Sequence, residues 1–416
     1  MSYHIYLKNF KALVSYATSN GINLVLPFLL LPVFTSLLSK SDYGVIANFL
    51  ILFQISAILI SFGSNAAVSR AFWDKESINF RDYVSTSLIF NFFIFSLLIS
   101  LALVLHFFFY FELISFSVII FCSGLVVTLK DYKFKLWNLE KKPFKYSVFN
   151  STFSISNYLL ALFFVFSFLP DWRSRVYGVF ITQIVFCLIS LLFLMRENKL
   201  SFAFNFKYMK DIFSYGYPLF FHGLGVVLLS SADKIILTSL VDLSSTGLLA
   251  VAAVVASLMS IPILTFDLFV NPIINEILKE SSKKSMRRFS RYLLLNIFIL
   301  GISGFLLYLL TPFIFSLFID EQFYQSEFLV GYLIIGQFFY GLYRFFSRPI
   351  FFSKKTYLVT FCTFLSGIIG LAAQFFLIGS FGLVGACIGN AFGYFLSFLF
   401  SLIISKRLYD FRIISN

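Results

Sequence analysis

The sequence predicts an all-α polytopic membrane protein with twelve transmembrane helices. Hydrophobic residues make up 59% of the 416-residue chain and charged residues only 12%, whereas a soluble domain has roughly 25% charged residues. The mean hydropathy is +0.91. Twelve apolar stretches each supply the ~20 residues that a helix needs to cross the hydrocarbon layer. They are continuous and do not alternate, which excludes a membrane β-barrel.

The first segment follows Lys8 and Lys11, as the core of a signal peptide would, but it is too long and lacks a small-x-small cleavage site. We therefore expect it to be a retained first helix. The twelve segments lie near residues 12–37, 45–66, 84–108, 113–130, 147–169, 176–195, 214–241, 247–270, 289–314, 328–350, 357–379 and 382–405.

The positive charges alternate between the two sides of the predicted membrane. All but four of the 32 Lys and Arg fall at inward segment ends if the N-terminus is cytoplasmic, the exceptions being Lys40, Arg173, Arg175 and Lys234. This is the positive-inside distribution. It predicts two cytoplasmic termini, and it accounts for the net charge of +13 without a nucleic-acid partner.

The chain contains an internal repeat. "TSLLSKSDYGVIA" (Thr35–Ala47) recurs as "TSLVDLSSTGLLA" (Thr238–Ala250) at an offset of 203, and "YGV" (Tyr177–Val179) corresponds to "FGL" (Phe381–Leu383) at 204. Repeats of six helices enter the membrane in the same sense, with an axis along the membrane normal. We expect two pseudo-symmetric six-helix lobes, 1–200 and 201–416, around a central cavity. A duplication kept only for packing is the other interpretation.

Neither the loops nor the motifs indicate an enzyme. The longest outward loop, Phe315–Glu327, is too short for a catalytic domain, and the sequence has no Walker, GxSxG, HExxH or DxD motif. We expect a transport protein, with no cofactor, no metal site and no ATP site of its own.

Asp233 and Lys234 lie side by side in the apolar stretch "SSADKIILTSL", where each charge costs roughly 2.5–3.5 kcal/mol at a bilayer centre. Neighbouring helical residues project about 100° apart, so we expect the two charges not to neutralise each other. Lys234 then either binds an anionic head group in the cavity or snorkels to the outer surface. Asp233 would hold a cation or a basic residue of the opposite lobe.

Two further polar residues interrupt apolar segments. Asp267 lies in "PILTFDLFVNP", between Pro262 and Pro272. It is either a proton site or cation partner, or it makes a structural hydrogen bond to backbone that the prolines free. His222 lies in "YPLFFHGLG". It either titrates near neutral pH or is a satisfied polar side chain.

Arg344 and Arg348 lie four residues apart in "GLYRFFSRPIFF", on one helical face. Two guanidiniums on one face suit a diphosphate, because each binds oxygen atoms bidentately. Anchoring to lipid phosphates is the alternative. Arg70, in "SFGSNAAVSRAFW", allows the same two interpretations.

Pro27 and Pro32 lie five residues apart in the first segment. Because proline removes a backbone donor and kinks a helix, we expect these two residues, with Pro262 and Pro272, to form gates or hinges. Static kinks are the alternative.

Several of these stretches resemble one family. "LLSKSDYGVIA" and "SFGSNAAVSR" in the first lobe are similar to the opening of bacterial polysaccharide-unit (O-antigen or capsule) flippases. "YPLFFHGLGVVLLSSADKIILTSLVDLSSTGLLAVAA" resembles the family's pattern of a Pro, an Asp followed by a basic residue, and a later Gly. "FGLVGACIGNA" (Phe381–Ala391) resembles its twelfth-helix signature. The superfamily also contains the multidrug and toxin extrusion transporters.

The resemblance implies alternating access that flips an undecaprenyl-diphosphate-linked oligosaccharide from the cytoplasmic to the outer leaflet of the bacterial inner membrane. Asp233 and Lys234 take the family's acidic and basic positions. The implied partners are that lipid, bulk membrane lipids, and the polymerase and other proteins of polysaccharide assembly, with a monomer as the functional unit.

Three rival functions stay open. A cation-coupled multidrug exporter of the same superfamily is less favoured, because segment 12–37 has no carboxylate, which some exporters use as an ion site. A membrane polysaccharide polymerase or ligase would need a large outward loop with Arg or His. A lipid-binding structural protein would not explain paired lobes and buried charges.

Overall fold

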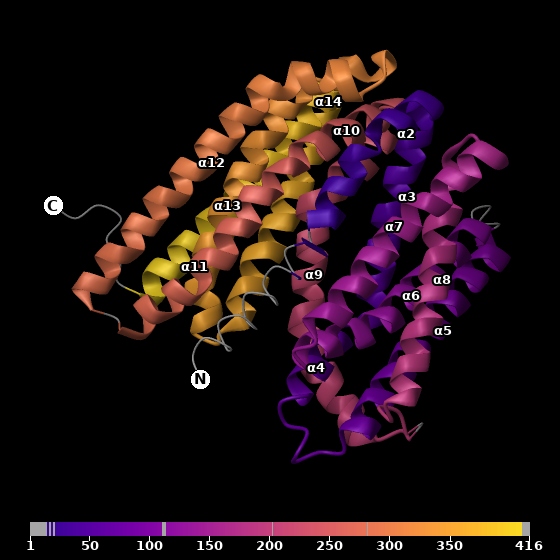
Figure 1. The fold of residues 1–416 in the computed structure, drawn as a ribbon, viewed down its shortest axis with the longest axis vertical. Helices are drawn as coiled ribbons and strands as arrows, with labels where there is room; N and C mark the ends of the chain where they lie inside the picture. The colour runs from indigo at the N-terminus through magenta and orange to yellow at the C-terminus, as the bar shows by residue number, and fades with distance from the viewer. Residues whose placement is uncertain are drawn as a thin grey trace. The chain divides into compact units, whose positions relative to one another are not determined.

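The computed structural model describes residues 15, 18–19, 21–109, 114–201, 203–280 and 282–409. Within them the chain forms α-helices and two 3-10 turns, shown in Figure 1. Nine described helices are long and apolar enough to span a membrane, and Gly21–Leu37 is a shorter apolar helix. Lys8, Lys11 and Arg412, which contribute to the prediction of cytoplasmic termini, lie outside the described residues.

The helices follow the expected segments in order. They are α2 (Leu31–Leu37), α3 (Lys40–Ser61), α4 (Ser64–Ala71), α5 (Phe80–Phe109), α6 (Ile114–Leu139), α7 (Pro143–Ser167), α8 (Trp172–Arg196), α9 (Phe206–Leu240), α10 (Leu243–Ala256), η1 (Ser257–Met259), α11 (Ser260–Glu280), α12 (Lys283–Phe318), η2 (Glu321–Ser326), α13 (Leu329–Phe352) and α14 (Thr356–Leu408).

Three boundaries differ from the expected ones. The second segment breaks at Phe62 and Gly63, both with positive φ, before α4 begins. The eleventh and twelfth segments form one long helix, α14, interrupted at Gly382 with φ 54° and ψ −127°, a conformation that glycine adopts readily. Helix α6 continues to Leu139, so Lys130, Lys133 and Lys135, expected in a loop, lie in its last turns.

Polar caps begin several helices. Asp171 accepts a hydrogen bond from the backbone of Arg173 at the start of α8, and Asp242 accepts one from Ser245 at the start of α10. Ser282 and Ser285 form a capping box at α12. Each cap satisfies backbone donors that have no partner in the first helical turn.

The chain divides into two compact units. Unit 1 contains Met1–Leu26 and Phe49–Phe220, and unit 2 contains Pro27–Asn48 and Phe221–Asn416. The units therefore do not follow the chain order of the expected lobes, 1–200 and 201–416, which stay a prediction. The core of unit 1 forms where α4, α5, α6 and α8 meet, and that of unit 2 where α10 to α13 meet.

The first-repeat segment Pro27–Asn48 packs on second-repeat elements inside unit 2. The Phe28 ring lies 5.1 Å from that of Phe318 in α12. Gln322 donates from its side-chain amide to the Thr35 carbonyl oxygen at 2.8 Å. These contacts explain why the end of the first helix and the start of α3 group with α12 and η2.

The repeat shows in reciprocal contacts within unit 2. The Ser41 and Ser244 hydroxyl oxygens, which are related by the offset of 203, lie 2.9 Å apart. A Cβ at Gly44 would clash with the Leu243 carbonyl oxygen, and one at Gly247 would clash with that of Lys40. By the offset of 203, residue 40 corresponds to residue 243 and residue 44 to residue 247. The two close approaches are therefore equivalent contacts, as a two-fold relation between the repeats requires.

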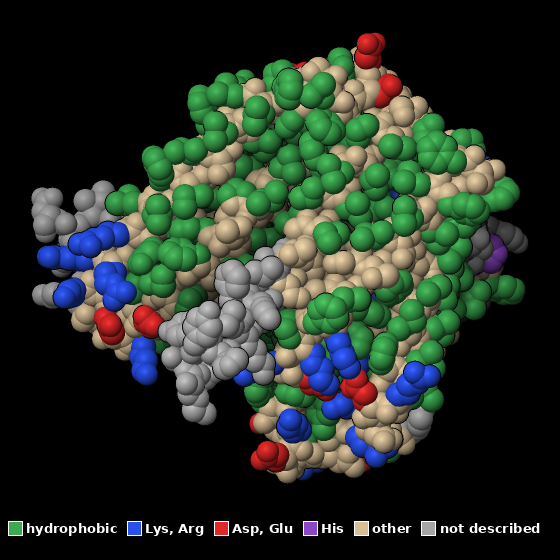
Figure 2. Space-filling model, in the orientation of Figure 1, with side chains coloured by type: hydrophobic (Ala, Val, Ile, Leu, Met, Phe, Trp, Pro, Cys, Tyr) green, Lys and Arg blue, Asp and Glu red, His purple; other side chains and the backbone are tan. Residues whose placement is uncertain are grey.

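The side chains sort by polarity along the helices. Figure 2 shows hydrophobic side chains over the long faces and Lys and Arg gathered at helix ends. Large apolar side chains such as Phe107 and Phe376 are 77% and 73% exposed. Such exposure suits helices surrounded by lipid and not by water.

We predict that Gly247→Ala destabilises the protein, because its Cβ would meet backbone that cannot move aside alone; overpacking typically costs about 1–3 kcal/mol. The measurement is the Tm of the purified protein in detergent. Gly301→Ala in α12 is the matched control, because a Cβ there meets nothing within 4 Å. Equal Tm values for the two variants would contradict the close crossing.

Candidate functional site

The charges inside the apolar segments gather in clusters, and one cluster lies in unit 2 between α11 and α13. Asp267 of α11 accepts contacts on one carboxylate oxygen, Oδ2, from Nε and Nη2 of Arg344. Nη2 of Arg348 lies 3.1 Å from the same oxygen. Their spacing of four places both arginines on one face of α13. One carboxylate therefore binds two guanidiniums, and the cluster keeps a net charge of +1.

Burial differs within this cluster. The Asp267 side chain is 8% exposed, whereas those of Arg344 and Arg348 are 29% and 22% exposed. Tyr340, one turn before Arg344, accepts a hydrogen bond from Nη1 of Arg344 at 3.0 Å. The carboxylate is buried, while the two arginine side chains are partly exposed.

The structure corrects the expectation for Asp233 and Lys234. They pair directly, with Lys234 Nζ 3.2 Å from Asp233 Oδ1, because the long lysine side chain bends back along α9. Asn390 of α14 donates to the Leu229 carbonyl oxygen at 2.9 Å and lies 3.5 Å from Asp233 Oδ2. Asp233 is 1% and Lys234 13% exposed. The pair is neutral and largely buried.

His222 also has a partner in unit 2. Its Nδ1 lies 2.9 Å from the Thr363 hydroxyl, and that hydroxyl donates to the Val359 carbonyl oxygen at 3.1 Å. The Thr363 hydroxyl therefore satisfies the Nδ1 position of His222 by a hydrogen bond. This contact matches the interpretation of His222 as a satisfied polar side chain.

Arg70 belongs to a cluster in unit 1. It pairs with Asp211 of α9 and lies over the Tyr215 ring, 4.4 Å from its centroid. Tyr83 of α5 donates to Asp211 Oδ2 at 2.7 Å. The cluster joins α4, α5 and the start of α9, and its ion pair is neutral. The Arg70 and Asp211 side chains are 38% and 41% exposed.

The ends of α6 and α8 in unit 1 also carry lysines that are paired with carboxylates. Glu140, between α6 and α7, accepts from Lys142 at 2.6 Å and Lys199 at 3.1 Å. Burial alone would raise the pKa of Glu140, but the hydrogen bonds from these lysines lower it overall. Lys133, whose side chain is fully buried, pairs with Glu197.

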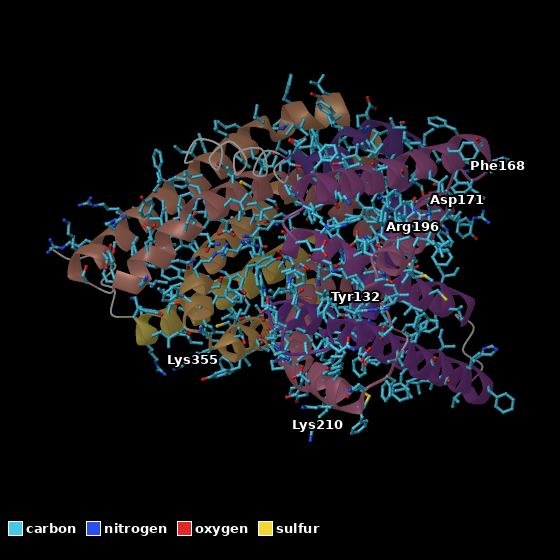
Figure 3. The ribbon with its side chains drawn as sticks, turned by 60° about the horizontal axis from the view of Figure 1, so that its bottom comes forward. Tyr132, Phe168, Asp171, Arg196, Lys210 and Lys355 are labelled. Atoms are coloured by element: carbon cyan, nitrogen blue, oxygen red, sulfur yellow. The ribbon has the colours of Figure 1, made fainter. Side chains whose placement is uncertain are left out.

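The interior of unit 1 holds an uncharged polar network. The Tyr132 hydroxyl, labelled in Figure 3, donates to Ser64 at 2.8 Å. Asn91 donates to the same hydroxyl at 2.8 Å, and the Ser87 hydroxyl lies 2.6 Å away. Ser64 corresponds to Asp267 by the offset of 203, so the charged cluster of unit 2 has an uncharged counterpart here.

The first helix is fixed to α7 in unit 1 by a ladder of hydrogen bonds. Three pairs make the ladder: Ser15 with Ser147, Ser19 with Asn150, and Asn23 with Ser154. Such bonds between apolar helices hold the helices together in a membrane. The ladder ends just before Pro27, where the chain passes to unit 2.

The predicted hinge prolines occupy different positions. The first helix is interrupted at Leu30, and Pro32 lies in the first turn of α2. Pro262 lies in the first turn of α11, directly after the 3-10 turn η1, where its missing N–H removes no helical hydrogen bond. Pro272 lies inside α11. Their movement as gates or hinges stays a prediction.

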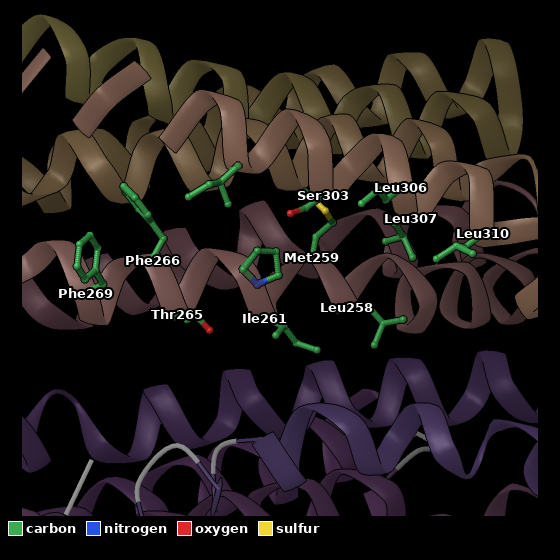
Figure 4. A pocket seen from close by; sticks show the side chains of 12 residues that line it. Leu258, Met259, Ile261, Thr265, Phe266, Phe269, Ser303, Leu306, Leu307 and Leu310 are labelled. Carbon is green, nitrogen blue, oxygen red and sulfur yellow. The ribbon is translucent and has the colours of Figure 1, made fainter. Parts of the chain in front are cut away.

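An apolar groove of about 660 Å³ lies in unit 2 between α11 and α12 (Figure 4). Its lining includes Met259, Pro262, Phe266, Phe269 and Leu306, with Thr265 and Ser303 as its polar members. No lining residue is charged. The groove suits hydrocarbon, so the polar chemistry of unit 2 belongs to the charged clusters.

Sequence reasoning missed several of these residues. Tyr340 lies four positions before Arg344 and was detectable from helical spacing. Asp211 is an acidic residue close to Lys207 and Lys210 in the sequence. Its negative charge was the feature from which a basic partner could have been expected. Arg175 binds Asn157 and lies 3.9 Å from the Tyr158 ring centroid. This last contact depends on how α7 and α8 pack after the turn between them, which a local sequence pattern does not specify.

Comparisons with known proteins give a consistent result. The profile of a family described as "Polysaccharide biosynthesis protein" matches residues 10–274, more than half of the chain. "Lsg locus putative protein 1" of Haemophilus influenzae is 23% identical over 377 residues, which cover 88% of this chain and 90% of that protein.

Two solved structures share the fold. An inward-facing multidrug resistance MATE family transporter of the MOP superfamily superimposes with a TM-score of 0.72 at 14% identity, covering 94% of each chain. The lipid II flippase MurJ in an inward closed conformation gives 0.70 at 17% identity, covering 95% of this chain and 87% of its own.

We predict that Asp233→Asn lowers the Tm more than the double change Asp233→Asn, Lys234→Met. The single change leaves a buried ammonium without its partner, which typically costs about 3–5 kcal/mol, whereas removing both charges is often neutral. The measurement is thermal unfolding in detergent, with Lys234→Met alone as the second single variant. Additive losses in the double variant would show that the two charges do not interact.

Proposed function

We propose, from the premise that this chain belongs to the polysaccharide biosynthesis protein family, that it flips an undecaprenyl-diphosphate-linked oligosaccharide, an O-antigen or capsule repeat unit, across the bacterial inner membrane. The direction is from the cytoplasmic to the outer leaflet. The family membership and the transporter fold support a translocase of this general kind. The identity of the lipid carrier and its cargo is our proposal.

The observation that carries the proposal is the excess positive charge at Asp267, Arg344 and Arg348. A diphosphate that enters a bilayer must replace its water with fixed cationic donors. Arg348 contacts Asp267 through Nη2. In the described part of the chain, Nε and Nη1 of Arg348 have no protein partner. Arginine has five N–H donors in a planar fork that matches phosphate oxygens. The cluster can therefore accept an anion without losing its present contacts all at once.

Lys234, Asp233, Arg70 and His222 have smaller parts in this proposal. Each has a partner within its own unit, so none offers an unopposed charge in this arrangement. We propose that Lys234 reaches the diphosphate only if its pair with Asp233 opens. Arg70 would contact the substrate only after release from Asp211.

The multidrug exporter is the rival within the same fold. A site for cationic drugs needs surplus negative charge, and the cluster at Asp267 has surplus positive charge. Segment 12–37 contains no carboxylate. A polymerase or ligase would need catalytic groups on a large outward loop, whereas the connection between α12 and α13 is the short turn η2. The surplus positive charge and the short connection between α12 and α13 favour a lipid-diphosphate flippase that is not itself an enzyme.

The cycle that we propose is alternating access by a monomer with both termini in the cytoplasm. The contact of Ser41 with Ser244 would hold the outward ends of the two repeats together before the substrate leaves. Polysaccharide polymerase and other assembly proteins would receive the flipped unit. The lipid tail would stay in the surrounding membrane.

We predict that cells lacking this gene lose their surface polysaccharide and accumulate a complete lipid-linked unit on the inner leaflet. The double change Arg344→Ala, Arg348→Ala should fail to restore export, and Arg344→Lys, Arg348→Lys should restore part of it, because lysine keeps the charge without the fork. The measurements are polysaccharide gels and analysis of extracted lipid.

Arg287→Ala, Arg288→Ala is the matched control, because it removes two arginines from the first turns of α12, where Arg288 lies 4.0 Å from Glu280 and not at Asp267. Full export by the alanine double variant at Arg344 and Arg348 would contradict the proposed site. Normal glycans with raised drug sensitivity in the deletion strain would favour the exporter.

We also predict that a disulfide between Ser41→Cys and Ser244→Cys blocks export reversibly. The native hydroxyl oxygens lie 2.9 Å apart, a separation that rotamer adjustment can reduce to a sulfur–sulfur bond of about 2.05 Å. The experiment replaces the four native cysteines by alanine and follows export under oxidant and then reductant. Each single variant is the control. Unchanged export with the disulfide formed would show that these ends need not separate.

A further inference from the structure

We propose that Asp267 is an internal substitute for the substrate's anion: it occupies the Arg344 and Arg348 guanidiniums in the empty protein and gives them up when the diphosphate binds. This inference rests on the proposed function and concerns the regulation of the same site. It makes Asp267 a positioning residue that sets the affinity for the diphosphate. It also gives the site a way to release that group.

The first step is the electrostatic repulsion between the two arginines. Arg344 and Arg348 both reach one oxygen of Asp267, so their positive charges lie close together. In a low-dielectric region two like charges repel strongly unless an anion lies between them. An empty site with two arginines therefore needs a resident anion, and Asp267 is the carboxylate that the structure places there.

The second step is the difference in burial between Asp267 and the two arginines. Its side chain is 8% exposed, whereas the arginines are 29% and 22% exposed. The carboxylate is thus more deeply buried than the two arginine side chains, each of which keeps part of its surface exposed. An incoming anion can contact free N–H groups before the bonds to Asp267 break.

The third step is the mismatch between the single charge of Asp267 and the two charges of the arginines. Asp267 offers one negative charge, and the contacts that the structure shows from both arginines converge on its Oδ2. A diphosphate diester carries one negative charge on the oxygens of each phosphate group and can give each guanidinium its own pair of oxygens. The substrate is therefore the better partner for two arginines, and Asp267 is adequate only in its absence.

The fourth step is reciprocity. Once the diphosphate is bound, the nearby carboxylate is a like charge that weakens its binding. Because such coupling acts equally in both directions, the return of Asp267 to the arginines favours release of the diphosphate. Tyr340 keeps Arg344 in place through its hydroxyl contact at 3.0 Å, so the guanidinium does not have to move for the exchange.

The experiment measures inorganic pyrophosphate binding to the purified full chain by calorimetry, together with export in cells. Asp267→Asn should bind pyrophosphate about tenfold more tightly than the wild type, a shift that corresponds to one lost opposing interaction, and should export less. Glu276→Gln, which removes an exposed carboxylate from the same helix, is the control and should match the wild type. A merely structural Asp267 would lower both binding and export when changed.

A second measurement uses the unaltered protein and so does not depend on the folding of a variant. Carbodiimide labelling of Asp267, read by mass spectrometry, should increase when pyrophosphate is added, because the carboxylate is released. Unchanged or reduced labelling at saturating pyrophosphate would overturn the inference.

The outcomes separate this inference from the proposed function. If the wild type binds pyrophosphate through Arg344 and Arg348, but Asp267→Asn binds it no more tightly, the substitution role fails and the diphosphate site stands. If the double variant Arg344→Ala, Arg348→Ala binds pyrophosphate as well as the wild type, or no form binds it, the diphosphate site fails and the inference fails with it.

Discussion

The contact of one buried carboxylate with two guanidiniums organises the second unit of this protein. Charges inside an apolar environment are stable only when paired and hydrogen-bonded, and Asp267 satisfies this condition for Arg344 and Arg348 together. The same constraint fixes α11 against α13 at this level. It also leaves a surplus of one positive charge, which is the chemical feature most relevant to an anionic lipid head group.

The pairing rule explains the remaining charged groups as well. Asp233 pairs with Lys234, Arg70 with Asp211, and Lys133 with Glu197. Each of these pairs is neutral, and each ties neighbouring turns or helices together. Glu140 with Lys142 and Lys199 also has more positive than negative charge, but it lies between helices. The cluster at Asp267 differs because two guanidiniums converge on one carboxylate inside apolar helices, and this arrangement distinguishes it as the candidate site.

Much of the fold followed from elementary patterns, and the limits of those patterns are physical. Apolar length placed the helices, and the offset of 203 identified the two repeats. It did not predict that equivalent residues of the repeats touch, as Ser41 and Ser244 do. Helical spacing anticipated that Arg344 and Arg348 share a face. It failed for Asp233 and Lys234, because a fixed angle between neighbours ignores the reach of a flexible lysine side chain. The grouping of Pro27–Asn48 with unit 2 depends on long-range packing, which no local pattern records.

The most direct test of the account is to reconstitute the purified protein in liposomes with the lipid-linked saccharide that accumulates in the deletion strain. A membrane-impermeant reagent that modifies the saccharide would then report which leaflet it occupies. The account predicts that the inner-leaflet pool becomes accessible with the wild type and stays protected with the double variant Arg344→Ala, Arg348→Ala. Equal access with both proteins, or protection with both, would contradict the claim that this protein moves a lipid-linked diphosphate through that cluster.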